Sequence, residues 1–313
     1  MDTVVYAARL KDKEKLMKSS SGGMFRAISD FFLKQEWAVV CSRYNYELQK
    51  TEFSLVTTAD EQDKAIGSKY MQSDSGNVYI KAIEWLKNNP QKKLLFVGMG
   101  CQAAGFRKFS ELNNFRERVI IVDIICHGAV SPGFWKNYAD TLGKFDYLTF
   151  KDKRNGWIRP TAFVRKGEKE IFLNDYIKIF YNHSALRPSC YQCPYATVER
   201  QSDITIGDYW GIDKVMPDFY SFDGNSLVLI HTEAGVDVWN KITAELEWRE
   251  SNVEDCLQPN LIKPTERPVT RERFWNEYQQ FGIKYIMKKY GSIPMKSRIK
   301  SKIKKVVKSL LPM

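Results

Sequence analysis

The sequence lacks any run of about 18 uninterrupted apolar residues, the length that a membrane-spanning helix needs. Its first residues also lack the long apolar stretch behind a basic flank that marks a secretory signal peptide. Without export signals the chain is expected in the cytoplasm, where its 6 cysteines stay reduced. The cysteines therefore indicate metal binding, catalysis or core filling rather than disulfides.

Acidic residues are absent from residues 295–313, which carry seven basic residues. The net charge of the whole chain is +11, so the remainder carries only +4. Neither a helix-turn-helix pattern nor an aromatic RNA-binding signature occurs in that remainder, and nucleic acid is not an expected partner. The high pI reflects the tail.

No internal repeat and no low-complexity linker interrupts residues 1–292, so we predict one α/β domain of mixed α+β type, followed by a basic amphipathic tail at 293–313. A helix is expected to begin near Met24, and residues 11–18 are expected to form a polar loop. The other predicted helices are 78–86, 102–112, 134–142, 235–246 and a C-terminal helical portion at 274–290. The predicted strands are 4–10, 37–41, 53–57, 93–97, 119–125, 147–151, 161–165, 204–206 and 227–231.

The clearest unit is a central βαβ crossover made of strand 93–97, helix 102–112 and strand 119–125. Cys101 follows the first of these strands and Cys126 follows the second. Because parallel strands end at the same edge of a sheet, where α/β proteins bind ligands, we expect the two thiols to lie close together. The start of a helix at Cys101 favours its thiolate form.

Cys190 and Cys193 form a Cys-x-x-Cys turn that is followed by proline, a combination frequent beside iron–sulfur clusters. Together with Cys101 and Cys126 they suit an iron–sulfur cluster, but structural zinc also takes four thiolates. Core-filling or redox-active cysteines are a third interpretation. Cys41 and Cys256 are expected to be small buried hydrophobes, as free cysteines commonly are.

A serine- and glycine-rich run, Ser19, Ser20, Ser21, Gly22 and Gly23, precedes the first long helix. Its hydroxyls, flexible backbone and free N–H groups are the ingredients of a phosphate cradle. The same composition also suits an ordinary helix N-cap. A Gly-x-Gly-x-x-Gly dinucleotide fingerprint after a strand is absent.

A series of sequence blocks occurs in a fixed order between Val4 and Thr232, namely 19–25, 67–73, 100–102, 123–128 with 131–132, 151–157, 187–193, 202–211 and 223–226. As an ordered series these blocks resemble the coenzyme F420 hydrogenase/dehydrogenase beta-subunit family. The resemblance implies an oxidoreductase that uses FAD for hydride or electron transfer and holds at least one [4Fe-4S] cluster. It implies four cluster ligands, namely Cys101, Cys126, Cys190 and Cys193.

The resemblance also implies flavin contacts. The FAD pyrophosphate is expected at residues 19–23, with Lys69 and Gln102 as further cofactor-binding residues. A solvated surface position for Lys69 is the alternative. His127, beside Cys126, is the candidate for proton delivery near the flavin, and a hydrogen-bonded structural histidine is the competing interpretation.

Relatives encoded in bacterial polysaccharide gene clusters imply an anionic nucleotide-sugar or glycolipid substrate. Lys153, Arg154 and Trp157 form a basic and aromatic loop that suits such a substrate.

Many relatives carry a ferredoxin-like segment before the serine block, whereas no cysteine precedes Cys41 here. A separate electron donor or acceptor, ferredoxin-like or a reduced cofactor, is therefore implied. A non-catalytic electron-transfer subunit and a zinc-stapled transferase or scaffold of polysaccharide assembly are the alternative functions.

The tail yields the first prediction, that residues 295–313 dock the protein at the inner face of an anionic membrane. Apolar residues fall along one helical face and lysines fill the other. Each basic residue near an anionic leaflet contributes on the order of 1 kcal/mol. In co-sedimentation with anionic vesicles, the intact chain should bind and salt should weaken binding, whereas a chain ending at Pro294 should stay in the supernatant. Equal binding by both chains would remove the tail from membrane contact.

Overall fold

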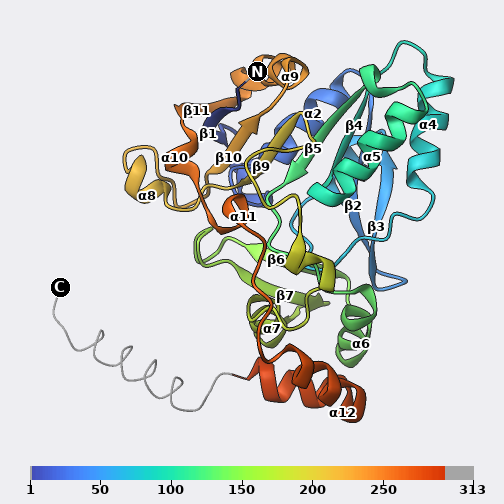
Figure 1. Ribbon diagram of the computed structural model, residues 1–313, viewed down its shortest axis with the longest axis vertical. Helices are drawn as coiled ribbons and strands as arrows, with labels where there is room; N and C mark the ends of the chain where they lie inside the picture. Colours follow the sequence, from blue (N-terminus) through green and yellow to red (C-terminus); the bar gives the residue numbers. More distant parts are fainter. Residues whose placement is uncertain (1, 293–313) are drawn as a thin grey trace.

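The computed structural model describes residues 2–292, and the predicted amphipathic tail lies outside them. The main sheet has eight strands in the order β11-β1-β10-β9-β5-β4-β2-β3 (Figure 1). In chain order the strands are β1 (Val4–Leu10), β2 (Ala38–Asn45), β3 (Lys50–Val56), β4 (Leu94–Met99), β5 (Val119–Ile124), β9 (Ile204–Asp208), β10 (Ser226–Ile230) and β11 (Leu246–Ser251). Strands β2, β4, β5 and β9 pair in parallel at the centre, and the outer pairs are antiparallel.

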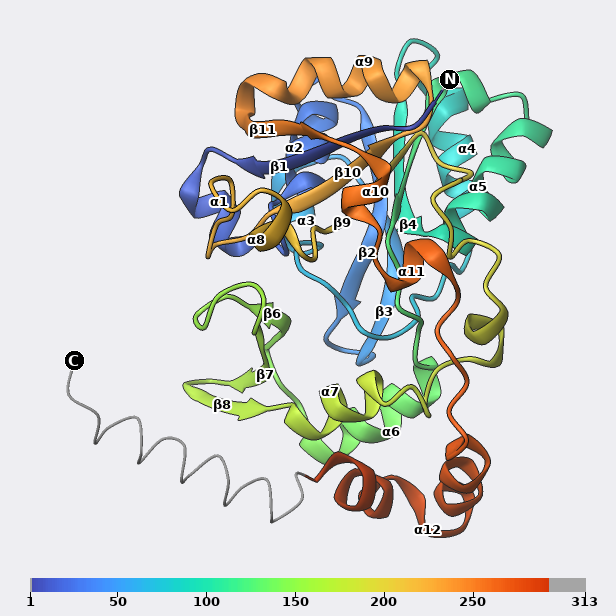
Figure 2. The same cartoon turned by 60° about the vertical axis from the view of Figure 1, so that its left-hand side comes forward.

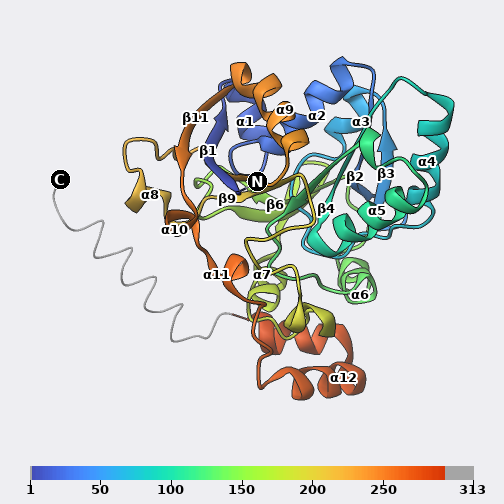
Figure 3. The same ribbon diagram turned by 45° about the horizontal axis from the view of Figure 1, so that its top comes forward.

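Helices cover both faces of this sheet because the central strands are apolar on both sides. Alternate residues enter opposite cores: Leu95 and Ile120 face one layer, whereas Leu94 and Ile121 face the other. Helices α2 (Met24–Lys34) and α9 (Glu233–Ile242) complete the first layer. Helices α4 (Val78–Asn88) and α5 (Gly100–Leu112) complete the second, at the right in Figures 1 and 3.

A second set of elements, here called the aromatic unit, comprises residues 132–181 and 271–291. Figure 2 shows it below the main sheet. Its core contains the fully buried side chains of Trp135, Tyr176 and Phe274. It is built from the three-stranded sheet β6 (Tyr147–Asp152), β7 (Thr161–Lys166) and β8 (Lys169–Phe172), and from helices α6 (Pro132–Leu142), α7 (Asn174–Tyr181) and α12 (Arg271–Gly291).

Short helices connect the larger elements. They are α1 (Lys13–Lys18), α3 (Ala59–Asp63), α8 (Ile212–Val215), α10 (Val253–Cys256), α11 (Pro259–Ile262) and the 3-10 turns at Arg116–Arg118, Pro188–Gln192 and Thr243–Glu245. No helix among residues 2–292 is long and apolar enough to cross a membrane.

The mixed α/β fold, the central βαβ unit and the helical C-terminal portion are confirmed, with Leu94 on β4 paired to Val119 on β5. Two local expectations were wrong. The expected polar loop at 11–18 contains α1, whose first turn is capped by the Asp12 side chain. The helix expected at 235–246 ends at Ile242, because Leu246 begins an edge strand that pairs with β1. Elements β8 and α7 were not expected at all.

The run at residues 19–23, here called the serine loop, lies tightly against the edge of two strands. Leu10 N donates to Gly22 O at 2.9 Å, and Gly22 N donates to Ser226 Oγ at 2.9 Å. A Cβ added at Gly22 would lie 2.3 Å from the carbonyl oxygen of Ala8, which real side chains do not tolerate. The glycine therefore permits this close approach.

Replacing Gly22 by alanine should destabilise the protein by about 1–3 kcal/mol, because the new methyl group must push the loop away from β1 and β10. The matched control is Gly133→Ala in α6, where an added Cβ meets nothing within 4 Å. This control should be neutral or slightly stabilising, because alanine favours helix. Thermal unfolding of both variants makes the comparison, and equal melting temperatures would contradict the packing argument.

Candidate functional site

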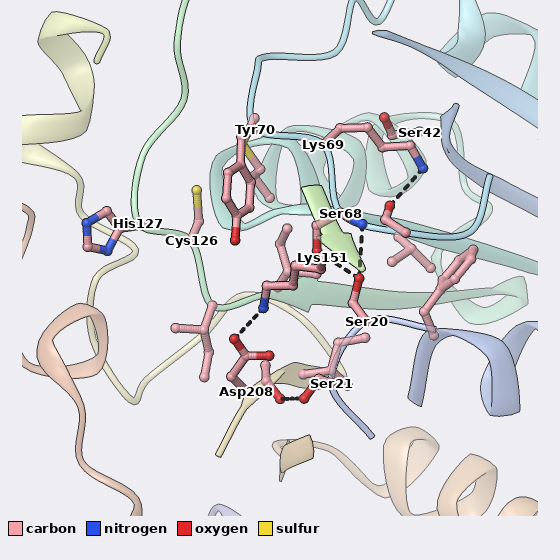
Figure 4. Close-up of a pocket in the computed structure, with 18 of the residues that line it drawn as sticks. Ser20, Ser21, Ser42, Ser68, Lys69, Tyr70, Cys126, His127, Lys151 and Asp208 are labelled. Atoms are coloured by element: carbon pink, nitrogen blue, oxygen red, sulfur yellow. Dashed lines mark hydrogen bonds and ion pairs between the residues drawn. The ribbon is translucent and has the colours of Figure 1, made fainter. Parts of the chain in front are cut away.

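A cavity of about 280 Å³, here called the larger cavity, lies at the carboxyl ends of the parallel strands. Met99, Ile124 and Asp208, the last residues of β4, β5 and β9, line it from the main sheet. Lys151 lines it from the aromatic unit (Figure 4), and Tyr181 lines it from the same unit. The cavity thus lies between the ligand-binding edge of an α/β sheet and the second unit.

The serine loop forms one wall of the larger cavity. Helix α2 begins at Met24 with Gly23 as its N-cap, in a left-handed conformation (φ +84°), and no side chain caps it. Ser19 Oγ instead donates to Lys15 O at 2.8 Å, and Ser21 Oγ donates to Asn225 O at 2.7 Å. The run thus supplies the helix N-cap, as the alternative interpretation expected, but through Gly23 and not through a serine. The first N–H groups of α2 remain without side-chain acceptors at the cavity, which suits an anion.

The other predicted flavin residues lie at different depths. Ser20 Oγ is 2.9 Å from Ser68 Oγ in the cavity wall, whereas Gly22 lies behind the loop and does not line the cavity. Lys69 lines the cavity but turns its ammonium to backbone carbonyls, including Gly67 O at 2.9 Å. Burial lowers the pKa of Lys69 to about 8. Gln102 lines the wall and accepts a hydrogen bond from Met99 N at 3.1 Å.

A second cavity of about 200 Å³, here called the smaller cavity, is lined by all four predicted ligand cysteines, Cys101, Cys126, Cys190 and Cys193. Cys101 is exposed and lies in the first turn of α5, and the other three are partly buried. Burial, and then the neighbouring thiols, raise the pKa of Cys126 to about 12. The cysteines from the βαβ unit and from the Cys-x-x-Cys turn thus meet at one place.

The four thiols line a cavity and do not gather around one point. Among residues 2–292, no three His, Cys, Asp or Glu side chains come together as they would around a single metal ion. The four sulfurs instead surround a cavity, and the backbone N–H of Ala129 points at Cys190 Sγ, 3.4 Å away. A cluster separates its thiolates by an inorganic core and accepts such N–H bonds. Four thiols that line an open space, with an N–H group aimed at one of them, are compatible with the cluster expected from the sequence.

A buried ion pair, which the sequence did not predict, lies beside the smaller cavity. Arg200 Nη1 lies 3.2 Å from Asp123 Oδ2, and both side chains are 2% exposed. Ser202 and Thr205 also donate to Asp123. Arg200 lines the smaller cavity. The sequence feature that could have indicated this ion pair is Asp123, an acidic residue within the apolar strand predicted at 119–125.

His127 lines both cavities. Its Nε2 lies 2.6 Å from Nε2 of His183, and its buried Nδ1 has no protein partner among the described residues. Burial, followed by the nearby His183, lowers the pKa of His127, so the imidazole is neutral at neutral pH. Gln258, 5% exposed, likewise has an unpartnered Oε1 and lines the larger cavity. Such orphaned atoms are expected where a ligand supplies the partner.

The predicted basic and aromatic loop does not form an open anion site. Lys153 is 3% exposed and Trp157 is 4% exposed. Arg154 is paired with Asp152 and Glu170 at 2.6 and 2.7 Å. The loop interpretation was wrong because the chain after β6 turns two of these three side chains inward and acidic neighbours neutralise the third.

The cysteine geometry predicts which thiols matter for metal retention. Cys126→Ser should lose most of the iron of anaerobically prepared protein and lower its melting temperature, because bound metal stabilises the folded state. Cys256→Ser is the matched control, because Cys256 is buried in a core away from both cavities. Iron analysis and thermal unfolding measure both effects. Iron loss in the Cys256 variant with retention in the Cys126 variant would overturn the ligand set.

Comparisons with known proteins place this site in context. Residues 91–255, more than half of the chain, match the family model that describes the C terminus of the coenzyme F420 hydrogenase/dehydrogenase beta subunit. The match contains all four cysteines of the smaller cavity. No curated protein matches the chain.

Among solved structures, a chain of the F420-reducing [NiFe] hydrogenase complex from Methanosarcina barkeri, from a xenon derivatisation study, has a similar fold. The two share 19% sequence identity with a TM-score of 0.56, over 91% of this chain and 94% of that chain. At this identity the likeness concerns the fold alone, whereas the family match rests on sequence. The chain belongs to the coenzyme F420 hydrogenase/dehydrogenase beta-subunit family.

Proposed function

We propose that the protein is an iron–sulfur flavoprotein oxidoreductase, with FAD in the larger cavity and a [4Fe-4S] cluster in the smaller one. One observation carries this proposal: the two cavities share a wall. Met99, residues 126–129 and Asn260 line both. Two redox groups placed in these cavities would be separated by little more than one stretch of backbone, which suits electron exchange between them.

The residues of the larger cavity fit FAD. The uncapped start of α2 offers N–H groups and a positive helix end to the pyrophosphate. Apolar and aromatic side chains, among them Met24 and Phe53, provide walls for a flat ring. The unpartnered Oε1 of Gln258 is an acceptor that a ring or ribityl donor would satisfy.

The residues of the smaller cavity fit a four-iron cluster. Four thiols surround it, and the fully buried guanidinium of Arg200 lines it beside them. A positive group there complements the negative charge of a thiolate-bound cluster. Backbone N–H bonds to sulfur, such as that from Ala129, tune the potential of the same group.

A flavin exchanges hydride with a substrate and single electrons with a cluster, so the protein's own task is to position and shield both groups. Tyr70, stacked on Phe180 with ring centroids 4.5 Å apart, closes the larger cavity beside His127. Lys151 and Asp208 form an ion pair in the wall of this cavity, where they would orient polar atoms of a bound molecule (Figure 4). Proton delivery by His127 stays a prediction.

The exposed position of Cys101 supports a separate electron donor or acceptor, ferredoxin-like or a reduced cofactor, docking near the smaller cavity. A non-catalytic electron-transfer subunit is the second candidate, because the similar solved chain comes from a hydrogenase complex. A sugar or glycolipid substrate rests on the family resemblance alone.

Anaerobically purified protein should be brown and contain about four iron atoms and one flavin per chain, because the four cysteines match a [4Fe-4S] ligand set. The measurement is an absorbance spectrum with metal and flavin analysis. Stoichiometric zinc without flavin would refute the proposal. Flavin turnover with a substrate in the absence of any partner protein would separate the enzyme from the electron-transfer subunit.

A further inference from the structure

Lys153 is a buried ammonium that joins the aromatic unit to the serine loop. It follows β6, yet its Nζ donates to Leu16 O at 2.7 Å and to Ser21 O. The side chain crosses from one unit to the other and is 3% exposed. Gly224 leaves room for it, since a Cβ there would lie 3.2 Å from this Nζ and 2.2 Å from Ser21 O.

No carboxylate among residues 2–292 forms an ion pair with Lys153. The two carboxylates whose charge acts on Lys153 form ion pairs with other lysines. Asp208 pairs with Lys151, and Asp223 pairs with Lys13. A buried cation held only by carbonyls is costly and is normally paired. The pocket around Lys153 therefore has an excess of positive charge directly behind the serine loop.

The opposite side of the serine loop faces the larger cavity. Ser21 and Gly23 take left-handed conformations, with φ of +50° and +84°. These two residues turn the chain so that α2 starts at the cavity without a side-chain cap. The carbonyl of Ser21, held by Lys153, lies within the turn that presents these N–H groups. An anion at the start of α2 would accept hydrogen bonds from the first N–H groups of the helix. It would also be attracted by the positive charge of the Lys153 ammonium.

We propose that Lys153 is the positioning residue for the anionic part of the cofactor, so that binding of a diphosphate at the serine loop is coupled to protonation of its ammonium. This inference rests on the proposed flavin site and adds a buried cation to it. The same contact makes the aromatic unit part of the phosphate site.

The sign of the coupling follows from the charges. Burial, and then the neighbouring Lys151, lower the pKa of Lys153 to about 7, against the opposite effects of Asp208 and Asp223. A bound diphosphate stabilises the ammonium and raises this pKa. Above about pH 7 the binding of FAD then takes up a proton, and affinity should fall by up to about tenfold per pH unit between the two pKa values.

Two groups that line the larger cavity, unlike Lys153, could also titrate near this range. Lys69 has a pKa of about 8, and the pKa of His127 lies below its ordinary value. The imidazole is therefore already neutral where the coupling operates. Lys69 is the rival, and its own variant is needed as a control.

The test measures the affinity of the flavin-free full-length chain for FAD and for riboflavin, which lacks phosphate, from about pH 6 to about pH 9. FAD affinity of the wild type should fall with rising pH, and calorimetry in two buffers should show proton uptake for FAD but not for riboflavin. Lys153→Met should weaken FAD binding at the lowest pH at least about tenfold and remove the slope. Lys153→Arg should retain tight binding without the slope. Arg154→Gln, next in sequence but outside the cavity, should match the wild type.

Different results separate the hypotheses. A wild-type slope that survives in Lys153→Met and disappears in Lys69→Met would overturn the inference, as would equal proton uptake for FAD and riboflavin. If Lys153→Met does not fold, Lys153→Arg and Lys69→Met decide: the slope should disappear in the first and persist in the second, and the reverse would overturn the inference. Failure of the wild type to bind FAD at any pH would refute the proposed flavin site instead.

Discussion

The contact between Asp123 and Arg200 is the interaction on which the arrangement of the cysteines depends. Two opposite charges, each almost fully removed from water, are tolerable only when they remain paired, and deleting one partner of such a pair costs about 3–5 kcal/mol. Asp123 lies three residues before Cys126, and Arg200 also donates to Thr197 O at 2.7 Å, in the segment that follows Cys193. One carboxylate thus fixes the end of a central strand and a distant loop against each other. The contact thereby helps to bring together cysteines that two distant parts of the chain contribute.

The larger cavity depends on a different kind of constraint, the close approach of backbone to backbone. The serine loop touches the sheet without a side chain at Gly22, and the aromatic unit reaches the loop through Lys153. Neither contact is apolar, although large apolar cores lie on both sides. The hydrophobic cores stabilise each unit by itself. The polar contacts of Gly22 and Lys153 determine how the walls of the larger cavity are oriented relative to each other.

Sequence patterns predicted the central unit because β4, α5 and β5 are strongly periodic and apolar, and parallel pairing then determines where Cys101 and Cys126 emerge. Sequence patterns did not predict the elements and buried residues whose conformation depends on contacts with distant parts of the chain. Residues 246–251 carry charges on both sides of the strand, as an edge strand does, and only pairing with β1 makes them extended. Lys153 could not be identified as buried, since a basic residue in a polar loop gives no local sign that distant carbonyls will enclose it. Arg200 escaped notice for the same reason.

The wall at residues 126–129 has a consequence for how such a protein can change over time. Gly128 has a φ of +131° and packs so closely on Leu186 that an added Cβ would lie 2.6 Å from that side chain. A substitution in this stretch displaces the lining of both cavities at once. Mutations within residues 126–129 that adapt one cavity to a new ligand therefore also alter the other cavity, so changes in this stretch are constrained by both. Divergence within a lineage should instead accumulate at the mouth of the larger cavity, around Tyr181 and Trp210, where replacement affects one compartment only.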